Sequence, residues 1–281
     1  MSSFELNTLK SSDLASVEII TNPAAEYGSD VSAVILIKTK QPLAGLYVSG
    51  KGNVTASEEW SESVGANLQY HNDKGLTVFG DISYGWDGFK QTRHYAEIFK
   101  RTSDAEETLT TLSDETAKKR SQSLTADGGL NYDFGKNSAG IKYIFSRTPK
   151  SKFTSEGNSS TDVLPISDIT STTSLDAKTF DHYINAFGDF KLPLSIGLRA
   201  DFDYMFGENT SCWDAKEEET ERIITNSNKS NHDYFGAKLR IDRKLGDIEV
   251  EAGAEYAYTK NDQSFTSHGL SDMFTMSSSD I

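Results

Sequence analysis

Five histidines and one cysteine are the residues of this sequence whose types most readily support metal or nucleophilic chemistry. The histidines are His71, His94, His182, His232 and His268, and none has a partner at the spacing of a metal-binding motif. Cys212 is the single cysteine, which excludes an internal disulfide framework and a cysteine-based metal cluster. The sequence therefore predicts no metal site.

Two short arrangements are similar to parts of catalytic sites. His232 and Asp233 lie near Ser230, but no nucleophile elbow accompanies them, so a solvated strand end is the preferred interpretation. Asp201 and Asp203 would share one face of a strand, as the paired carboxylates of a glycosidase do. Because Asp and Glu recur on this face of several predicted strands, we interpret it as a polar face. We expect no catalytic residue and no enzyme activity.

Two further motifs could bind ions. The acidic run Lys216–Glu221 could attract a cation, but a run of charge in a loop is usually only solvated. Gly50 and Gly52 flank Lys51 inside a predicted strand, where glycine marks a bend or close packing and not a phosphate-binding loop. We expect no cofactor, and the sequence does not identify ligand-binding residues.

The elements that would position these residues are strands with period-two patterning. Apolar and polar side chains alternate over about eleven residues at a time, which is roughly twice the length of an average soluble strand. A tilted strand that crosses a bilayer needs ~9–11 residues. This length predicts an all-β fold, an antiparallel up-and-down transmembrane β-barrel of which about ten strands are present from Leu43 onward. The clearest segments are Leu76–Trp86, Leu124–Phe134, Ile196–Phe206 and Ile248–Tyr258.

Short turns and long polar loops alternate between the predicted strands, as in a barrel with a periplasmic and an exterior end. The short turns contain Gly, Asn, Asp or Pro, and Cys212 would lie near the exterior end of its strand. The predicted short turns are His71–Gly75, Gly135–Ser138, Lys191–Ser195 and Lys244–Asp247. The predicted long loops are Arg101–Lys119, Glu156–Ser171, Lys216–Arg222 and Asp262–Gly269.

The last hairpin allows a prediction of register. Centring its turn on Leu245 and Gly246 keeps apolar residues on one face and an ion pair on the other. The predicted pairs are Phe235 with Tyr256, Leu239 with Ala252, and Arg240 with Glu251. Asp181–Lys191 is ambiguous, because two phases compete: Tyr183 and Phe187 in one, Ile184, Ala186 and Phe190 in the other.

Composition excludes several classes of protein. The 281-residue chain has a net charge of −14, which argues against nucleic-acid binding. Its 11% aromatic content is not typical of a disordered chain. No apolar run is long enough for a transmembrane helix, and the first six residues lack the basic and apolar regions of a signal peptide.

The stretch Asp13–Lys40 differs from the rest of the chain. Two apolar runs, Val17–Ile20 and Ala33–Ile37, would form buried strands, and Pro23 lies between them. Ala24–Tyr27 leaves room for about one helical turn, which Gly28–Asp30 would break. This order of residues resembles the end of the plug domain of TonB-dependent outer-membrane receptors. The matching residues are Asp13, Leu14, Ser16, Val17, Glu18, Ile19, Ile20, Pro23, Ala25, Tyr27, Gly28, Val34, Ile35, Ile37, Thr39 and Lys40.

The resemblance implies the end of a plug domain at residues 1–42 and the first part of an outer-membrane barrel at residues 43–281. Receptors of this family bind a nutrient at exterior loops and the plug, and a TonB-type energy-coupling complex then opens a path. The implied partners are outer-membrane lipid, that complex and an unidentified nutrient.

The chain departs from the family pattern, in which an export signal, a motor-binding box, most of a plug and about twenty-two barrel strands are expected. We therefore expect a fragment that does not transport by itself. Two alternatives remain. One is a passive or structural outer-membrane barrel, which has no plug. The other is a soluble β-sandwich binding module that displays Trp60, Trp86 and Trp213, and it should not need detergent.

Overall fold

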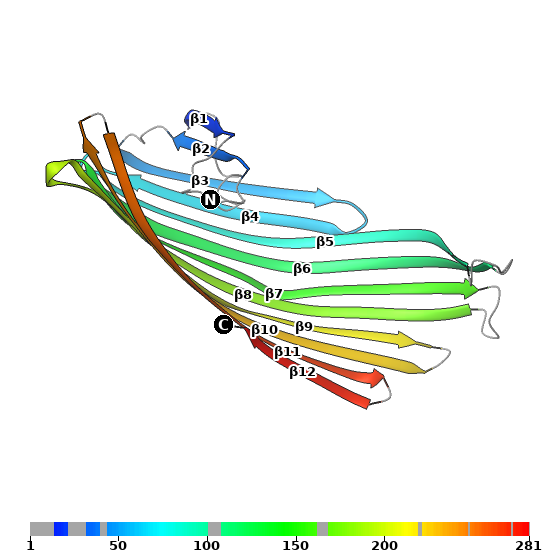
Figure 1. Ribbon diagram of the computed structural model, residues 1–281. Helices are drawn as coiled ribbons and strands as arrows, with labels where there is room; N and C mark the ends of the chain where they lie inside the picture. Colours follow the sequence, from blue (N-terminus) through cyan, green and yellow to red (C-terminus); the bar gives the residue numbers. More distant parts are fainter. Residues whose placement is uncertain are drawn as a thin grey trace. The chain divides into compact units, whose positions relative to one another are not determined.

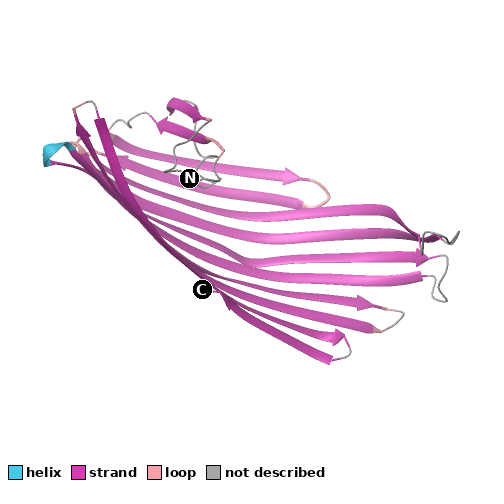
Figure 2. Cartoon of the chain, viewed as in Figure 1, coloured by secondary structure: helices cyan, strands magenta, loops and turns pink. Residues whose placement is uncertain are grey.

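The computed structural model describes residues 14–21, 32–39, 44–100, 108–161, 168–218, 221–246, 248–270 and 272–280. The chain divides into two units, residues 1–45 and residues 46–281, and each is described by itself. Strands make up nearly all of the described residues (Figure 2), which confirms the predicted all-β fold. No helix among these residues is long and apolar enough to cross a membrane.

The first unit contains a two-stranded antiparallel sheet, β1 (Leu14–Ile20) and β2 (Val34–Thr39). Both strands were predicted, and Ile19 pairs with Ile35. The prediction that they are buried is wrong, since Val17, Ile19 and Ile35 are 51%, 64% and 61% exposed. A two-stranded sheet is a single layer that covers neither of its own faces. The predicted turn at Pro23, the helical turn and Gly28–Asp30 lie outside the described residues.

The second unit is one antiparallel sheet of ten strands in sequence order, as predicted (Figure 1). Each strand pairs with the next along the chain, and β3 and β12 lie at opposite edges. The strands are β3 (Gly45–Ala56), β4 (Trp60–His71), β5 (Leu76–Lys100), β6 (Thr108–Phe134), β7 (Asn137–Thr161), β8 (Asp168–Leu192), β9 (Ile196–Glu217), β10 (Arg222–Leu245), β11 (Ile248–Leu270) and β12 (Asp272–Asp280).

The short turns lie where the sequence predicts them. Residues 72–75 join β4 to β5, residues 135–136 join β6 to β7, the 3-10 segment η3 (Pro193–Ser195) joins β8 to β9, and residues 246–247 join β10 to β11. Gly75, Gly135 and Gly246 have positive φ angles of 87°, 69° and 66°. Glycine adopts this conformation without a Cβ clash, so these turns can be tight.

The predicted lengths of strands and loops are wrong. Strands β5 to β11 have 22 to 27 residues, about twice the predicted eleven. Residues 108–119, 156–161, 168–171 and 262–269, predicted as parts of long loops, belong to paired strands. The loop at Lys216–Arg222 is close to its prediction, because β9 ends at Glu217 and β10 begins at Arg222. Beyond the roughly eleven residues next to the short turns, these strands carry polar side chains on both faces, so hydrophobic alternation no longer marks them.

The register of β10 and β11 differs by two residues from the prediction, because Leu245 pairs with Ile248 and the turn lies one residue later. A shift of two residues keeps every side chain on its predicted face. The predicted pairs become diagonal neighbours, and two of the three are in contact. The rings of Phe235 and Tyr256 are 6.2 Å apart, and Arg240 Nε lies 3.7 Å from Glu251 Oε1.

The structure also settles the phase of β8. Ile184 pairs with Tyr143 of β7 and Tyr204 of β9, so Ile184, Ala186 and Phe190 share the apolar face. Tyr183 lies on the opposite face and donates a hydrogen bond to Asp203.

Candidate functional site

Alternation gives the ten-stranded sheet two faces. We call the face that carries Ile82, Leu130, Leu198 and Leu239 the outer face, and the opposite one the inner face. The turn half is the part of the strands next to the short turns, and the loop half is the rest of β5 to β11. The turn half consists of residues 76–86, 124–134, 139–145, 182–192, 196–206, 235–245 and 248–258.

The outer face of the turn half is apolar and uncovered by any other described part of this unit. Phe202 is 51% exposed and Leu239 is 43% exposed. Across all described residues, Ala117 is the one apolar side chain that is fully buried. The sheet is therefore a single layer without a core. Exposed apolar residues on this face include Val78, Ile82, Tyr84, Leu130, Tyr132, Ile141, Tyr143, Phe202, Tyr204, Leu239, Ile241 and Tyr256.

An aromatic row marks the limit of this apolar face. Phe145, His182 and Phe206 are direct neighbours on β7, β8 and β9. The rings of His182 and Phe206 stack with centroids 4.4 Å apart, and the phenol of Tyr143 is hydrogen-bonded to His182 Nδ1 at 2.7 Å. Two residues further along the strands, the outer face carries charged side chains such as Arg147 and Glu208. Aromatic rings at the edge of an apolar band are typical of a membrane interface.

The inner face of the turn half carries paired charges. Asp203 accepts hydrogen bonds from Tyr183 Oη at 2.5 Å and Asn185 Nδ2 at 2.9 Å. Arg199 Nη2 lies 2.7 Å from Asp189 Oδ2. The predicted polar face around Asp201 and Asp203 is confirmed as a network of ion pairs and hydrogen bonds. Asp203 and Asp189 are thus engaged by side chains of neighbouring residues, and these contacts join adjacent strands.

The inner face of the loop half has a different chemistry, because hydroxyl and amide side chains replace most of the charges. Ser230 Oγ donates to Asn261 Oδ1 at 3.1 Å, and Gln263 Nε2 donates to Asn228 Oδ1 at 3.2 Å. Half-buried aromatic rings from β7, β9 and β11 lie among them: Phe153, Trp213 and Phe265. Hydroxyl, amide and aromatic groups can bind a ligand by hydrogen bonding and stacking. Sequence reasoning missed this surface, because it joins side chains of several strands that only the strand register brings together.

The residues weighed as a catalytic triad do not come together. His232 Nε2 lies 3.0 Å from Asp181 Oδ1 on the inner face. Asp233 projects from the outer face, where Tyr204 Oη donates to it at 3.4 Å. Ser230 is bonded to Asn261 instead of His232.

The other candidate residues are dispersed. His71 is hydrogen-bonded to Thr77 at 2.8 Å, His94 contacts Asp114, and His268 lies near the end of β11. Gly50 and Gly52 lie inside β3, as predicted. Within the described ranges no group of three or more His, Cys, Asp and Glu side chains could hold a metal ion. Of the acidic run Lys216–Glu221, residues 219 and 220 lie outside the described residues.

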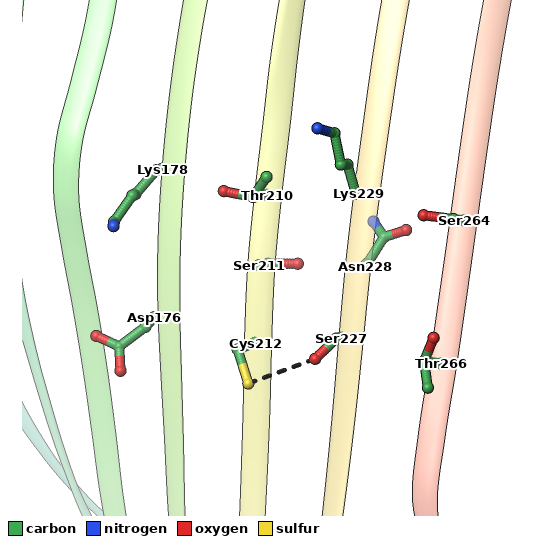
Figure 3. A pocket seen from close by; sticks show the side chains of 10 residues that line it. All are labelled: Asp176, Lys178, Thr210, Ser211, Cys212, Ser227, Asn228, Lys229, Ser264 and Thr266. Carbon is green, nitrogen blue, oxygen red and sulfur yellow. Dashed lines mark hydrogen bonds between the residues drawn. The ribbon is translucent and has the colours of Figure 1, made fainter. Parts of the chain in front are cut away.

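A shallow hollow lies on the outer face of the loop half, across β8 to β11 (Figure 3). Lys178 and Lys229 border it, separated by Thr210 of β9. Ser227 Oγ donates to Cys212 Sγ at 3.7 Å within it. Cys212 thus lies within the loop half of β9, in the hollow. Sequence patterns do not reveal this hollow, because it depends on the register of four strands.

No protein-family model and no curated protein matches the sequence. Among solved structures, the ferric yersiniabactin uptake receptor FyuA from Yersinia pestis aligns with 95% of this chain at 11% identity and a TM-score of 0.40. The ferric citrate transporter FecA aligns with 96% at 9% identity and a TM-score of 0.26. The ferric-catecholate import receptor Fiu from E. coli K12 aligns with 91% at 9% identity and a TM-score of 0.27. The chain spans about half of their lengths: 48%, 50% and 57%.

Proposed function

We propose that the ten-stranded sheet is a section of the wall of an outer-membrane β-barrel, and that the protein is a receptor of the TonB-dependent type that takes up a nutrient. The observation that supports a membrane location is that the outer face is divided into two bands. The same strands present an apolar, uncovered outer surface along the turn half and a polar one along the loop half. The proposal rests on this pattern and on the plug-like stretch Asp13–Lys40.

The size of the apolar band fits a bilayer. Eleven residues of strand extend roughly 36 Å, which at a tilt of about 40° spans about 28 Å. The hydrocarbon core of a bilayer is about 30 Å thick. A whole strand of 25 residues, such as β5, would extend roughly 80 Å. In this arrangement only the turn half lies in lipid, and the loop half projects beyond the membrane on the exterior side.

The two edges of the sheet set a condition for this proposal. Among the described residues β3 and β12 are not paired with each other, and each unpaired backbone group in hydrocarbon costs several kcal/mol. About half of the backbone groups of a spanning strand face the missing neighbour, so an open edge costs tens of kcal/mol in total. In the membrane both edges must therefore be paired, with each other or with further strands. Transport requires that closed wall, and this sheet alone does not provide it.

We assign Asp13–Lys40 to the end of the receptor's plug domain. In a closed barrel, the inner surface of the loop half on β7 to β11, with Trp213 and Phe153, would line the path from the exterior. We propose this surface as part of the ligand site. The TonB-type energy-coupling complex and an unidentified nutrient are the partners this mechanism needs.

Cysteine scanning along β9 tests the membrane assignment. In a Cys212→Ser background, single cysteines at positions 198–205 carry a fluorophore, and the complete barrel that contains this chain is folded into bilayers with a lipid-phase quencher. Strong quenching is expected at even positions and weak quenching at odd ones. Positions 210–215 should show weak quenching throughout. Equal quenching on both faces, or a folded chain that needs no detergent, would reject the membrane wall.

Uptake measurements separate the receptor from a passive barrel. Cells that carry the protein in its complete barrel are given candidate nutrients with and without a protonophore. A TonB-dependent receptor loses uptake when the membrane is de-energised. Diffusion through a passive barrel continues, and that result would reject the receptor assignment.

A further inference from the structure

On the outer face, strands β6, β7 and β8 carry a cluster of cations just beyond the aromatic row. The cluster consists of Lys118, Arg120, Arg147, Lys152 and Lys178, and all five side chains are exposed. Arg120 pairs directly with Lys152, so like charges stand side by side on neighbouring strands. In a chain whose net charge is −14, this is a local reversal of sign.

A bulge in β7 brings two of these cations together. Leu124 pairs with Arg147 and Ser121 with Ser151, so β7 contains one residue more than β6 between these points. The same extra residue appears against β8, between Thr148 and Ser151. Residues five apart in a regular strand lie on opposite faces, but the bulge reverses the phase. Arg147 and Lys152 therefore both lie on the outer face.

The cluster has few acidic partners. Arg120 is paired with Glu59 at 3.2 Å, and Asp176, beside Lys152, is the acidic side chain within the cluster. No ion pair among the described residues involves Lys118, Lys152 or Lys178. On β9 to β11 the outer charges are matched instead, as in Lys229 with Glu208 and Lys260 with Asp262, both at 2.7 Å. Unmatched like charges repel one another, so the cluster favours an anionic ligand.

The position of the cluster identifies the class of anion. Phe145 and Phe180 lie next to Arg147, where the apolar face of the turn half ends. Lys178 borders the hollow shown in Figure 3. A ligand held there would need apolar chains along the turn half and negative charge at the level of Lys152 and Lys178. We infer that this cluster is a binding site for the phosphorylated headgroup of a membrane lipid, which rests on the membrane location proposed above.

The test compares two lipids with identical chains, phosphatidylglycerol and phosphatidylcholine. The full chain is folded in micelles of an uncharged detergent, each lipid is added, and native mass spectrometry measures the bound lipid. Each cation near an anionic lipid surface contributes about fivefold in affinity. The triple variant Lys118→Gln, Lys152→Gln, Lys178→Gln should therefore bind phosphatidylglycerol roughly 100-fold more weakly. Phosphatidylcholine binding should not change.

A matched control removes the same charge from the inner face. The variant Lys119→Gln, Lys142→Gln, Lys238→Gln should keep its phosphatidylglycerol binding within about fivefold. Glycerol phosphate, which lacks acyl chains, should not compete at concentrations equal to those of the lipid. Strong competition would show a site for a soluble phosphate and would overturn the lipid assignment.

Two further outcomes separate this inference from the proposed function. If the wild-type chain binds both lipids equally while β9 still shows alternating quenching, the cation cluster is not a headgroup site and the membrane wall stands. If neither lipid binds and the quenching pattern is absent, both are overturned. Circular dichroism of each variant should show unchanged strand content.

Discussion

The turn half and the loop half of the sheet have the same backbone and opposite surfaces. In the turn half, the outer face is apolar and the inner face holds ion pairs such as Arg199 with Asp189. In the loop half, charges lie on the outer face and the inner face carries mainly hydroxyl, amide and aromatic groups. Ladder hydrogen bonds continue through both halves, so strand pairing does not depend on which side is apolar. The side chains instead determine whether each face is compatible with lipid or with water.

The largest effect is expected from a charge placed on the outer face of the turn half. Ile82→Arg should destabilise the protein folded in a bilayer by ~2–4 kcal/mol, because the guanidinium would lie in hydrocarbon. Ser83→Arg, on the inner face of the same strand, should cost much less. Thr210→Arg, on the outer face of the loop half, should change stability by less than about 0.5 kcal/mol. Denaturant titrations of folding into vesicles measure the stability of all three variants. Equal losses of stability at positions 82 and 83 would contradict the difference between the outer and inner faces.

A smaller loss of stability is expected from substitutions in the short turns. These turns set the register of the strands, which both halves share. Gly75 has a φ of 87°, and an added Cβ would overlap the carbonyl oxygen of Asp133. Gly135 has a φ of 69°, and an added Cβ would meet no atom within 4 Å. Gly75→Ala should therefore cost ~2–3 kcal/mol, from strain and overlap together. Gly135→Ala should cost about 1 kcal/mol, from strain alone. The same vesicle titrations test this pair, and equal costs would mean that the turn at residues 72–75 relaxes.

Protease accessibility tests whether the loop half is paired strand. Lys118, Lys119 and Arg120 are paired between β5 and β7 in the strand ladder, so trypsin should not cut there in the folded protein. Lys136, in the short turn, should resist trypsin added outside cells and become accessible when the periplasm is opened. Mass spectrometry of the fragments identifies the sites. Early cleavage between residues 118 and 120 would contradict the paired strand and support the loop that the sequence predicts for this segment.

The smallest effect concerns an exposed ion pair between the loop half of β5 and the turn that precedes β4. Lys90 Nζ lies 2.8 Å from Glu58 Oε2, and this hydrogen bond lowers the pKa of Glu58 and raises the pKa of Lys90. A lowered carboxyl pKa stabilises the folded state above the unfolded pKa, and this contribution is lost as pH falls through the folded pKa. Lys90→Gln should return the Glu58 pKa toward its ordinary value. NMR titration of the Glu58 carboxyl measures the shift, and an unchanged pKa would show that Lys90 does not act on it.

The sequence alone determined much of this sheet. Period-two alternation gave ten strands, and it placed Ile82, Leu130 and Leu198 on one face. Gly75 and Gly135 gave two of the short turns, because tight turns need residues that tolerate positive φ. These features are local, since they depend on residues a few positions apart in the chain.

Tertiary structure decided what local pattern cannot encode. Strand length in the loop half depends on backbone pairing, which leaves no hydrophobic signature when both faces are polar. The phase of β8 was ambiguous until Ile184 was paired on both sides. The bulge in β7 puts Arg147 and Lys152 on one face, and a one-residue mismatch exists only between two strands. For the same reason the candidate surfaces could not be found from the sequence, because each joins side chains from several strands that only the register brings together.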